Sequence, residues 1–357
     1  MEKKYRYLVQ LTPISSYFFG GENTFGEGKS ASYFAKSNRY PSQATLLGVM
    51  RYEILRQRNL LGLSDRNQCE QIIGARSFSI DEAVNVDGKM DFGIIDSLSP
   101  LFLQDRKTNS FFTAMPLDEG VDLGWETERC YLSGIQSTRM LISANFEPKN
   151  YDNYLYYVNP EKKRLDEILE ERCEGSKIFQ VVEQIGITKN KKERHDTDDD
   201  AYFKQELVVL HPDLCFACTM ATKQPLQIGS TMVFMGANRS VFKLEISQPD
   251  FLPDFCASGS ENYFAPLSRA DRYLLLSDAY LQSNVWRKAD FIWGEAVDFR
   301  SIKSHVKDGL SWKKPEKGCL YHLQAKGSVL LGKDLDACLT LPALQQIGLN
   351  LYVKPIK

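Results

Sequence analysis

The sequence predicts an α+β fold built on antiparallel sheets. Strand-like segments recur along the chain, few segments have a helical pattern, and the two do not alternate as they do in a doubly wound sheet. A length of 357 residues favours two domains, and 43% hydrophobic with 25% charged residues is ordinary for a globular protein. The chain has no repeat of about 20 to 50 residues.

The first expected elements are a strand, a glycine-rich loop and a helix. Residues 4–11 predict the strand, and residues 18–28 combine glycines with aromatic residues as a loop. Pro41 suits the first turn of a helix, and the Ser42 hydroxyl can cap it. Gly48 lies inside this helix, where it costs about 1 kcal/mol relative to Ala, so we expect it to permit close packing against a sheet. The apolar residues at helical spacing that predict the buried face are Leu46, Leu47, Met50, Ile54 and Leu55.

The remaining expected elements are mostly strands. A short charged helix is expected at 161–173, and the run at 189–200 is too polar for a core and predicts an exposed loop. Residues 241–246 alternate apolar and polar side chains, which is typical of a half-buried strand. Further strands are expected at 92–95, 110–115, 207–210, 214–220, 231–235, 321–325, 329–331 and 350–353.

Positive charge is concentrated at the two ends of the chain. Residues 1–59 and residues 301–357 each hold nine Lys or Arg and four Asp or Glu, a net charge of +5. The middle therefore carries −12 within the total of −2. Basic ends suggest a localised anionic partner if the ends meet in the fold, and lysines scattered over the surface are the alternative.

The sequence predicts a soluble, cytoplasmic protein with reduced thiols. The N-terminus lacks the apolar run of a signal peptide, and no stretch approaches the roughly 18 apolar residues of a membrane span. The eight cysteines are too dilute for a disulfide scaffold.

Two groups of metal-ligand residues occur, and neither predicts a metal site. Cys215 and Cys218 follow His211, but a structural zinc site usually needs a second cysteine pair, and a strand points these two thiols to opposite faces. Asp196 and the acids at 198–200 lack the rigid spacing that Mg²⁺ requires. We expect buried thiols, a solvated loop, and no metal or other cofactor.

A catalytic site is equally poorly supported. A metal-independent ribonuclease needs a general acid and base near the RNA, usually including His. The histidines are all in the second half of the chain, at His195, His211, His305 and His322. The sequence also lacks nucleophile-elbow, P-loop and HExxH motifs, so we expect no enzyme.

Glycines and aromatic residues support RNA binding instead. Backbone N–H groups approach a phosphate closely at glycine, and the basic helix start near Pro41 adds a seat for phosphate. The glycines concerned are Gly20, Gly21, Gly26, Gly28, Gly327 and Gly348. Stacking faces for unpaired bases are expected at Phe18, Phe19, Phe25 and Tyr33.

Several segments, in order, resemble the RAMP (repeat-associated mysterious protein) family, and within it the third subunit of type III-B (Cmr) CRISPR complexes. Tyr40 to Arg51 has that group's Pro-Ser helix start with a later Gly and Arg, and 183–187 reads Glu-x-x-Gly-Ile. Residues 234–239 stand where that group has a Leu-Gly-Gly-x-x-Arg turn, and Ala237 replaces the second glycine. Residues 325–329 and 346–350 resemble the glycine-rich C-terminal end, which here is interrupted at 349–350. The related handle-binding subunit of type III-A complexes is the alternative.

The resemblance implies two ferredoxin-like (RRM-like) domains with loop insertions, at 1–180 and 181–357. It implies a non-catalytic subunit in antiviral defence that holds the 5′ repeat-derived handle of the crRNA. Its neighbours would be the large Cas-ten-type subunit and the first backbone RAMP subunit. The expected RNA-binding residues are Gly21, Asn23, Arg39, Ser42, Gln43, Arg51, Arg239, Lys326, Gly327 and Ser328.

Two other functions are left open by the sequence. One is a metal-independent ribonuclease of the same fold that processes repeat RNA, with His195 or His322 as acid–base residue and Lys326 assisting. The other is a structural scaffold that contacts only protein, for which the basic ends have no evident use.

Overall fold

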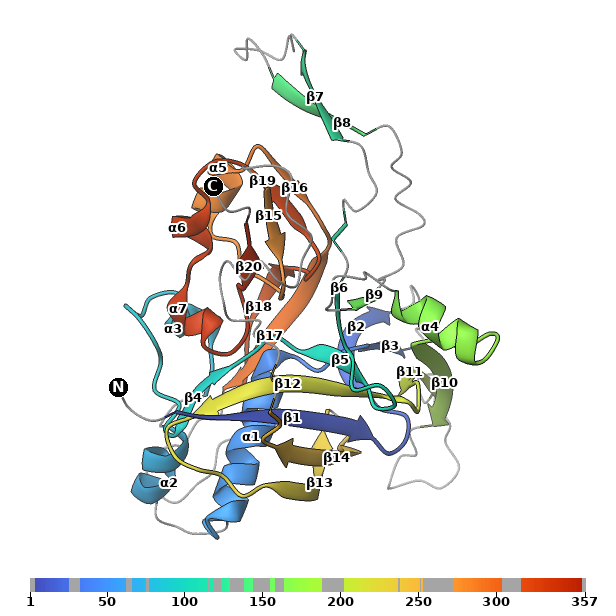
Figure 1. Ribbon diagram of the computed structural model, residues 1–357, viewed down its shortest axis with the longest axis vertical. Helices are drawn as coiled ribbons and strands as arrows, with labels where there is room; N and C mark the ends of the chain where they lie inside the picture. The colour runs from blue at the N-terminus through green and yellow to red at the C-terminus, as the bar shows by residue number, and fades with distance from the viewer. Residues whose placement is uncertain are drawn as a thin grey trace.

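The computed structural model describes most of the chain. The residues described are 4–25, 33–61, 66–74, 77–114, 116–117, 123–128, 138–143, 155–157, 164–187, 202–236, 238–250, 252, 272–303 and 316–354. The predicted polar loop at 189–200, together with Gly26 and Gly28, lies outside them. The fold is mixed α+β with mostly antiparallel sheets, which confirms the predicted class (Figure 1).

The largest sheet is built around the first strand. β1 (Tyr5–Pro13) lies between β12 (Leu214–Thr222) and β14 (Ser240–Ser247), antiparallel to both. β14 pairs with the edge strand β13 (Gly229–Met235). On the other side, β12 pairs with two more strands, and the sheet continues through β6 and β9. These strands are β4 (Ile95–Leu98), β5 (Phe102–Asp105), β6 (Phe111–Ala114) and β9 (Leu155–Tyr157).

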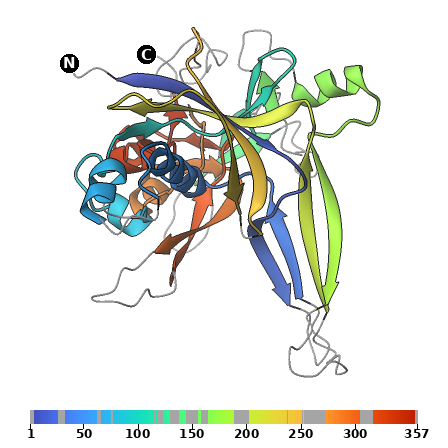
Figure 2. The same ribbon diagram turned by 90° about the horizontal axis from the view of Figure 1, so that it is seen from below.

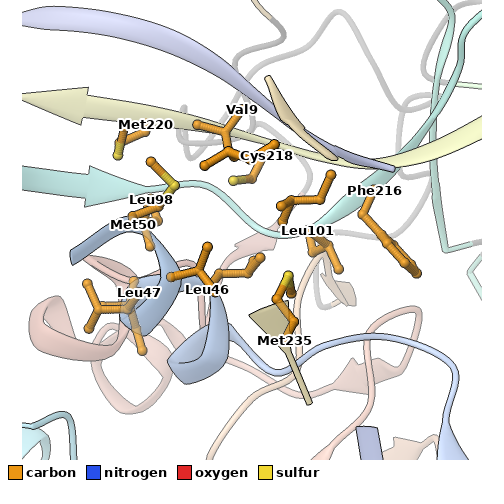
Figure 3. Packing of buried hydrophobic residues seen from close by; sticks show 14 of the residues in the cluster. Val9, Leu46, Leu47, Met50, Leu98, Leu101, Phe216, Cys218, Met220 and Met235 are labelled. Carbon is orange, nitrogen blue, oxygen red and sulfur yellow. The ribbon is translucent and has the colours of Figure 1, made fainter. Parts of the chain in front are cut away.

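Helix α1 (Gln43–Gln57) packs against one face of this sheet (Figure 2). Alternate residues of β1, including Val9, point toward the helix, whereas Leu8 packs on the opposite face with Phe102. Figure 3 shows Leu46, Leu47 and Met50 of α1 beneath Val9, Cys218 and Met220 of the sheet. The predicted apolar face of the helix is therefore confirmed at Leu46, Leu47, Met50 and Ile54, whereas Leu55 is only partly buried.

A second sheet projects from the body as an arm. Its order is β10 (Phe179–Ile187), β11 (Tyr202–Leu210), β3 (Tyr33–Asn38) and β2 (Phe19–Phe25). Figure 2 shows these four strands extending away from the large sheet. The predicted loop at 18–28 is thus wrong for Phe19–Phe25, because that segment pairs with β3; the shift in strand register falls between Gly20 and Asn23.

The C-terminal part contains a third sheet. Its order is β16 (Phe291–Trp293), β19 (Val329–Leu331), β15 (Arg272–Leu275) and β20 (Tyr352–Val353), all antiparallel. Four strands of the large sheet have the same arrangement: β1, β4, β12 and β14 correspond, in chain order, to β15, β16, β19 and β20. Both sets place the first strand between the third and the fourth, with the second beside the third.

Two hairpins and six further helices complete the described structure. The hairpins are β17–β18 (Ala296–Lys303 and Glu316–Gln324) and β7–β8 (Leu123–Glu128 and Thr138–Ser143). The helices are α2 (Arg66–Ile73), α3 (Ile80–Ala83), α4 (Leu165–Arg172), α5 (Ser283–Lys288), α6 (Asp336–Leu339) and α7 (Pro342–Gln345). Among the helices so described, none has the length and apolar character to span a membrane.

Two predicted strands begin later than expected. Residues 92–94 form a turn before β4, because Gly93 has a φ of +62° and a Cβ there would lie 2.2 Å from the Ile72 carbonyl oxygen at the end of α2. The last strand begins at Tyr352, since Asn350 is also in the left-handed region, with a φ of +54°.

The expected boundary at residue 180 stays a prediction. Strands from both sides of it share the large sheet, in which β1 pairs with β12 and β14. The main hydrophobic cluster also draws on Phe299, Leu323 and Ile347 from the C-terminal part.

Candidate nucleic-acid interface

Helix α1 begins at the cap that the sequence predicts. The Thr45 N–H donates to the Ser42 hydroxyl oxygen at 3.2 Å, and Ser42 has the extended backbone of an N-cap, with φ −69° and ψ 155°. The N-terminal N–H groups of a helix form a site of positive potential suited to a phosphate.

Gln43 joins this helix start to the C-terminal end of the chain. Its side-chain amide nitrogen donates to the Ser99 carbonyl at 3.0 Å and to the Gly348 carbonyl at 3.2 Å. Gly348 has a φ of +83°, and a Cβ there would lie only 2.4 Å from the same nitrogen, so glycine is required for this approach. The Gln43 side chain is buried, and its amide oxygen has no hydrogen-bond partner among the described residues.

The turn between β18 and β19 brings Lys326 to the same place. Gly327 has a φ of +87°, and its N–H donates to the Leu275 carbonyl at 2.8 Å. The Lys326 N–H donates to a carboxylate oxygen of Asp278 at 3.0 Å. The turn directs the Lys326 ammonium over the Tyr40 ring, 3.3 Å from the ring centroid, in a cation–π contact.

These segments line one pocket of about 250 Å³, here called the α1 N-terminal pocket. Arg39, Tyr40, Ser42 and Gln43 line it from the helix start, and Lys326 lines it from the C-terminal turn. The two basic ends of the chain therefore meet, as the charge distribution requires for a localised anionic partner.

Carboxylates line the pocket together with the basic residues. They are Asp278, Glu295 and Asp298, from the C-terminal part. Arg39 and Lys326 suit a phosphate, whereas carboxylates accept hydrogen bonds from the amino groups of nucleobases. The pocket thus offers contacts for both parts of a nucleotide and is not a simple anion site.

Burial alters the titration of two groups here. Burial lowers the pKa of Lys326 to about 8, although the Asp278 carboxylate acts in the opposite direction. Burial also raises the pKa of Tyr40, whose hydroxyl has no hydrogen-bond partner within the described part of the chain. A bound anion would offset the cost of burying the Lys326 ammonium, and a bound polar group could satisfy the Tyr40 hydroxyl.

The other predicted RNA-binding residues are placed differently. Gly327 and Ser328 form the turn behind Lys326, and the Ser328 hydroxyl accepts a hydrogen bond from the Gln324 amide at 3.2 Å. Arg239 follows β13 with a φ of +53°, and its guanidinium lies 5.1 Å from the Phe234 ring centroid. Neither Ser328 nor Arg239 lines the α1 N-terminal pocket.

Gly21, Asn23 and Arg51 also lie outside this pocket. Gly21 is in β2, where a Cβ would come 2.7 Å from the Lys36 carbonyl oxygen of β3. Asn23 is in the same strand, and its side chain is outside the described structure. Arg51 packs over the Phe92 ring at 5.1 Å, and burial lowers its pKa to about 10 while Asp91 raises it.

Two sequence expectations about this region are wrong. Phe18 and Phe19 are buried, and Phe19 stacks on Phe242 in the core, so they cannot stack on RNA bases. Gly48 is exposed, and a Cβ there would meet nothing within 4 Å, so it is not needed for packing against the sheet.

Sequence reasoning missed the three pocket carboxylates, because no motif marks them. Asp298 also contacts His322, with 2.7 Å between a carboxylate oxygen and Nδ1. Asp298 and His322 face each other across the β17–β18 hairpin. The alternation of side chains along these strands predicts such a pair only when the register of the hairpin is known.

The Cys215–Cys218 segment is strand β12, and both thiols are buried. Cys218 packs in the main core, whereas Cys215 lies beside Gln104 on the other face, as the strand alternation predicts. Burial raises the pKa of each thiol to about 12.

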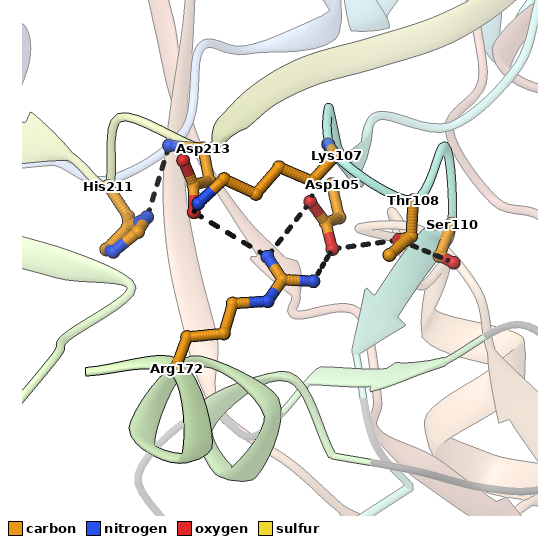
Figure 4. Close-up of polar contacts among 7 residues, drawn as sticks. All are labelled: Asp105, Lys107, Thr108, Ser110, Arg172, His211 and Asp213. Atoms are coloured by element: carbon orange, nitrogen blue, oxygen red, sulfur yellow. Dashed lines mark hydrogen bonds and ion pairs between the residues drawn. The ribbon is translucent and has the colours of Figure 1, made fainter. Parts of the chain in front are cut away.

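His211 belongs to a polar cluster that anchors α4 (Figure 4). Both terminal nitrogens of Arg172 donate to Asp105, at 2.5 and 3.2 Å, and Asp213 binds Lys107 at 2.6 Å. The Asp213 N–H donates to His211 Nδ1 at 3.2 Å, and burial lowers the pKa of His211. This cluster links α4 to the β5–β6 and β11–β12 turns and lies apart from the α1 N-terminal pocket.

Several solved structures resemble the chain. A chain in the cryo-EM structure of the type III-B Cmr-beta complex bound to cognate target RNA has 13% identity and a TM-score of 0.47, covering 93% of this chain and 88% of that chain. A chain of the Csm3–Csm4 subcomplex in the type III-A CRISPR-Cas interference complex has 13% identity and a TM-score of 0.36, covering 92% of each. No curated protein matches the sequence.

The family comparison covers nearly the whole chain. Residues 9–331 match the family described as CRISPR-associated protein (Cas_Cmr3), a stretch that begins in β1 and ends in β19 and includes all the residues that line the α1 N-terminal pocket. The chain belongs to the Cas_Cmr3 family of CRISPR-associated proteins.

Proposed function

We propose that the chain is a non-catalytic crRNA-binding subunit of a type III CRISPR effector and that it holds the 5′ repeat-derived handle. One observation carries this proposal: the start of α1 and the C-terminal turn, at opposite ends of the sequence, line a single pocket with Arg39 and Lys326. A phosphate fits the helix N-terminus and these cations, and a base fits the carboxylates.

The topology supports two ferredoxin-like units. The first would comprise β1, α1, β4, β12 and β14, and the second β15, α5, β16, β19, α6, α7 and β20. Each unit has its strands in the 4-1-3-2 order, with a helix after the first strand, as in a split βαβ arrangement.

We further propose that neighbouring protein subunits, the large Cas-ten-type subunit and the first backbone RAMP subunit, cover apolar edges of the molecule. The edge strand β10 exposes Val181, Val182 and Ile185, and the edge strand β13 exposes Met232 and Phe234. Exposed apolar edge strands are candidates for pairing with another chain.

The test is to sequence the RNA that co-purifies with the tagged chain when it is expressed with its genomic neighbours. We expect RNAs that share one 5′ end derived from the repeat. Lys326→Met should reduce their yield, and Lys333→Met, which changes an exposed lysine outside the pocket, is the control. RNAs with random ends, or none, would favour the scaffold function.

A repeat-processing ribonuclease remains the second candidate, because one observation favours it. Asp298, which binds His322, lines the same pocket as Lys326, so a potential acid–base group lies close to a lysine of lowered pKa. Incubation of the pure chain with repeat RNA in EDTA should produce no cleavage at a fixed position. Cleavage that His322→Ala abolishes would establish the enzyme instead.

A further inference from the structure

A second pocket lies along the side of α1, and the polar residues that line it are all basic or hydroxylic, beside Ala44, Leu47, Gly48 and Phe78. We call it the α1 side pocket; it has a volume of about 220 Å³. Arg51 lines it from α1 and Arg300 from β17, together with the hydroxyls of Ser42, Thr45, Ser77 and Ser301. No carboxylate is among the described residues that line it, in contrast to the α1 N-terminal pocket.

The two arginines suit an anion. Guanidinium groups bind phosphate oxygens through paired N–H donors, and hydroxyls add further donors. Arg300 is exposed, and its guanidinium makes no hydrogen bond or ion pair with any residue that the structure describes. Arg51 packs over the Phe92 ring, with its guanidinium 5.1 Å from the ring centroid, and this contact helps hold it at the pocket.

Gly48 points to the same site. It lies in the middle of a 15-residue helix, where glycine costs about 1 kcal/mol relative to Ala, and no neighbour within 4 Å explains its presence. It does line the α1 side pocket, and because a Cβ there would meet open space, a larger side chain at this position would occupy part of the pocket. Glycine therefore keeps the pocket open at the expense of helix stability.

The two pockets are neighbours, because Ser42 lines both. A volume of about 220 Å³ is several times the ~30 Å³ of a water molecule, which leaves room for a phosphate group. Successive phosphates of a nucleic acid strand could thus lie at the helix start and along its side.

We propose that the α1 side pocket binds a phosphate group, namely a backbone phosphodiester of the RNA whose adjacent nucleotide occupies the α1 N-terminal pocket. This inference rests on the proposed RNA-binding function. It assigns Arg300, Thr45 and Gly48 to the interface, none of which the sequence predicted.

Two substitutions, Gly48→Glu and Gly48→Gln, separate the effect of a negative charge from the effect of side-chain size. Glu and Gln have nearly the same size and are better helix formers than Gly, and the position is open, so both variants should be at least as stable as the wild type. The probe is a fluorescently labelled 20-nucleotide RNA that begins with the host repeat handle, measured by anisotropy. We expect Gly48→Glu to weaken binding about tenfold or more and Gly48→Gln to weaken it less.

Arg300→Ala should weaken binding and reduce the slope of log affinity against log salt by about 0.7, the value for one phosphate of a single strand. Arg58→Ala is the matched control, because it removes an arginine at the far end of α1 that lines neither pocket. Replacing one RNA linkage by a neutral methylphosphonate should weaken binding to the wild type but not to Arg300→Ala.

The outcomes distinguish the possible failures. Unchanged RNA affinity in Gly48→Glu and Arg300→Ala would overturn the proposal, even if the wild type prefers the handle RNA over a shuffled RNA. If inorganic phosphate raises the melting temperature of the wild type but not of Gly48→Glu, while RNA affinity is unchanged, the site binds free phosphate and the RNA assignment is wrong. If Gly48→Glu weakens handle and shuffled RNA equally and the wild type does not distinguish them, the phosphate site stands and the handle-binding function fails.

Discussion

The ammonium of Lys326 shows how a single buried charge links stability to pH. Burial lowers its pKa to about 8 from the ordinary lysine value of 10.5. Between these values the unfolded chain binds more protons than the folded chain, so the contribution of Lys326 to stability rises with pH across this window. Below pH 8 the cost of burying the charged amine is fully present.

Lys326→Met should therefore stabilise the RNA-free chain more at pH 7 than at pH 9.5. We expect this gain in the free energy of unfolding to shrink by about 2 kcal/mol between the two pH values, at about 1.4 kcal/mol per pH unit. Urea unfolding at both pH values measures it, with Lys333→Met as the control. A gain that is equal at both pH values would contradict the lowered pKa of Lys326.

Gly348 tests the contact between the two ends of the chain. Gly348→Ala forces a non-glycine residue to a φ of +83° and places its Cβ 2.4 Å from both the Gln43 amide nitrogen and the Ser99 carbonyl oxygen. Gly88 is the matched control, since it has a φ of +100° but open space around its Cβ. We expect Gly88→Ala to cost about 1 kcal/mol of folding free energy and Gly348→Ala at least about 3 kcal/mol, measured by urea unfolding. Equal costs would show that the ends are not in close contact.

At the scale of the element, α4 depends on one buried ion pair. Asp105 has a relative exposure of 1%, and burial alone would raise its pKa, but hydrogen bonds from Arg172, the Lys107 N–H and Thr108 lower it overall. The paired carboxylate therefore contributes stability at neutral pH that is lost as the pH falls through its lowered pKa.

Arg172→Met should destabilise the chain by about 3 kcal/mol or more at pH 7, because it leaves the Asp105 carboxylate buried without its cation. Hydrogen exchange should increase most in 165–172, the residues of α4. Arg164→Met is the control, since Arg164 pairs with Asp166 and Glu167 at the start of the same helix. Equal protection of α4 in both variants would show that Arg172 does not anchor the helix.

Local patterns predicted the elements better than they predicted the site. The cap at Ser42 and the alternation in β14 are short-range features, so the sequence alone predicts them correctly. The arm strand β2 was missed because its glycines suggest a loop, and only pairing with β3 makes it a strand. Phe18 and Phe19 were wrongly predicted to stack on RNA bases, because composition does not reveal which side chains of a strand are buried.

The pocket itself required information that no local pattern contains. Basic ends and glycine turns predicted an anion site in these segments, and Arg39, Ser42, Gln43 and Lys326 do lie together. Asp278, Glu295 and Asp298 come from a turn and a hairpin whose position depends on long-range packing of Phe299 and Leu323 in the main core. Arg300 escaped notice for the same reason, since it lies next to Phe299 on β17.

At the scale of the whole molecule, the two halves of the chain share one core. β1 has both of its neighbours, β12 and β14, from beyond residue 180, and the main cluster includes residues from β1 to Leu349. A smaller cluster around Leu275, Leu330 and Leu339 belongs to the C-terminal part alone, where α5 and α6 pack on the third sheet. This sharing explains how pockets form between segments that are distant in sequence.

We expect the full chain to unfold in one cooperative transition. Because Phe299, Leu323 and Ile347 of the C-terminal part are buried in the main cluster, neither part can lose its structure without exposing apolar surface of the other. Urea unfolding followed by tryptophan fluorescence and by far-UV circular dichroism should give coincident curves, and Leu323→Ala should shift both midpoints together. Two separate transitions would show that the parts fold independently, and Leu323→Ala would then shift only one of them. Cooperative unfolding would mean that the α1 N-terminal pocket exists only in the intact chain, so that RNA binding and global stability are lost at the same urea concentration.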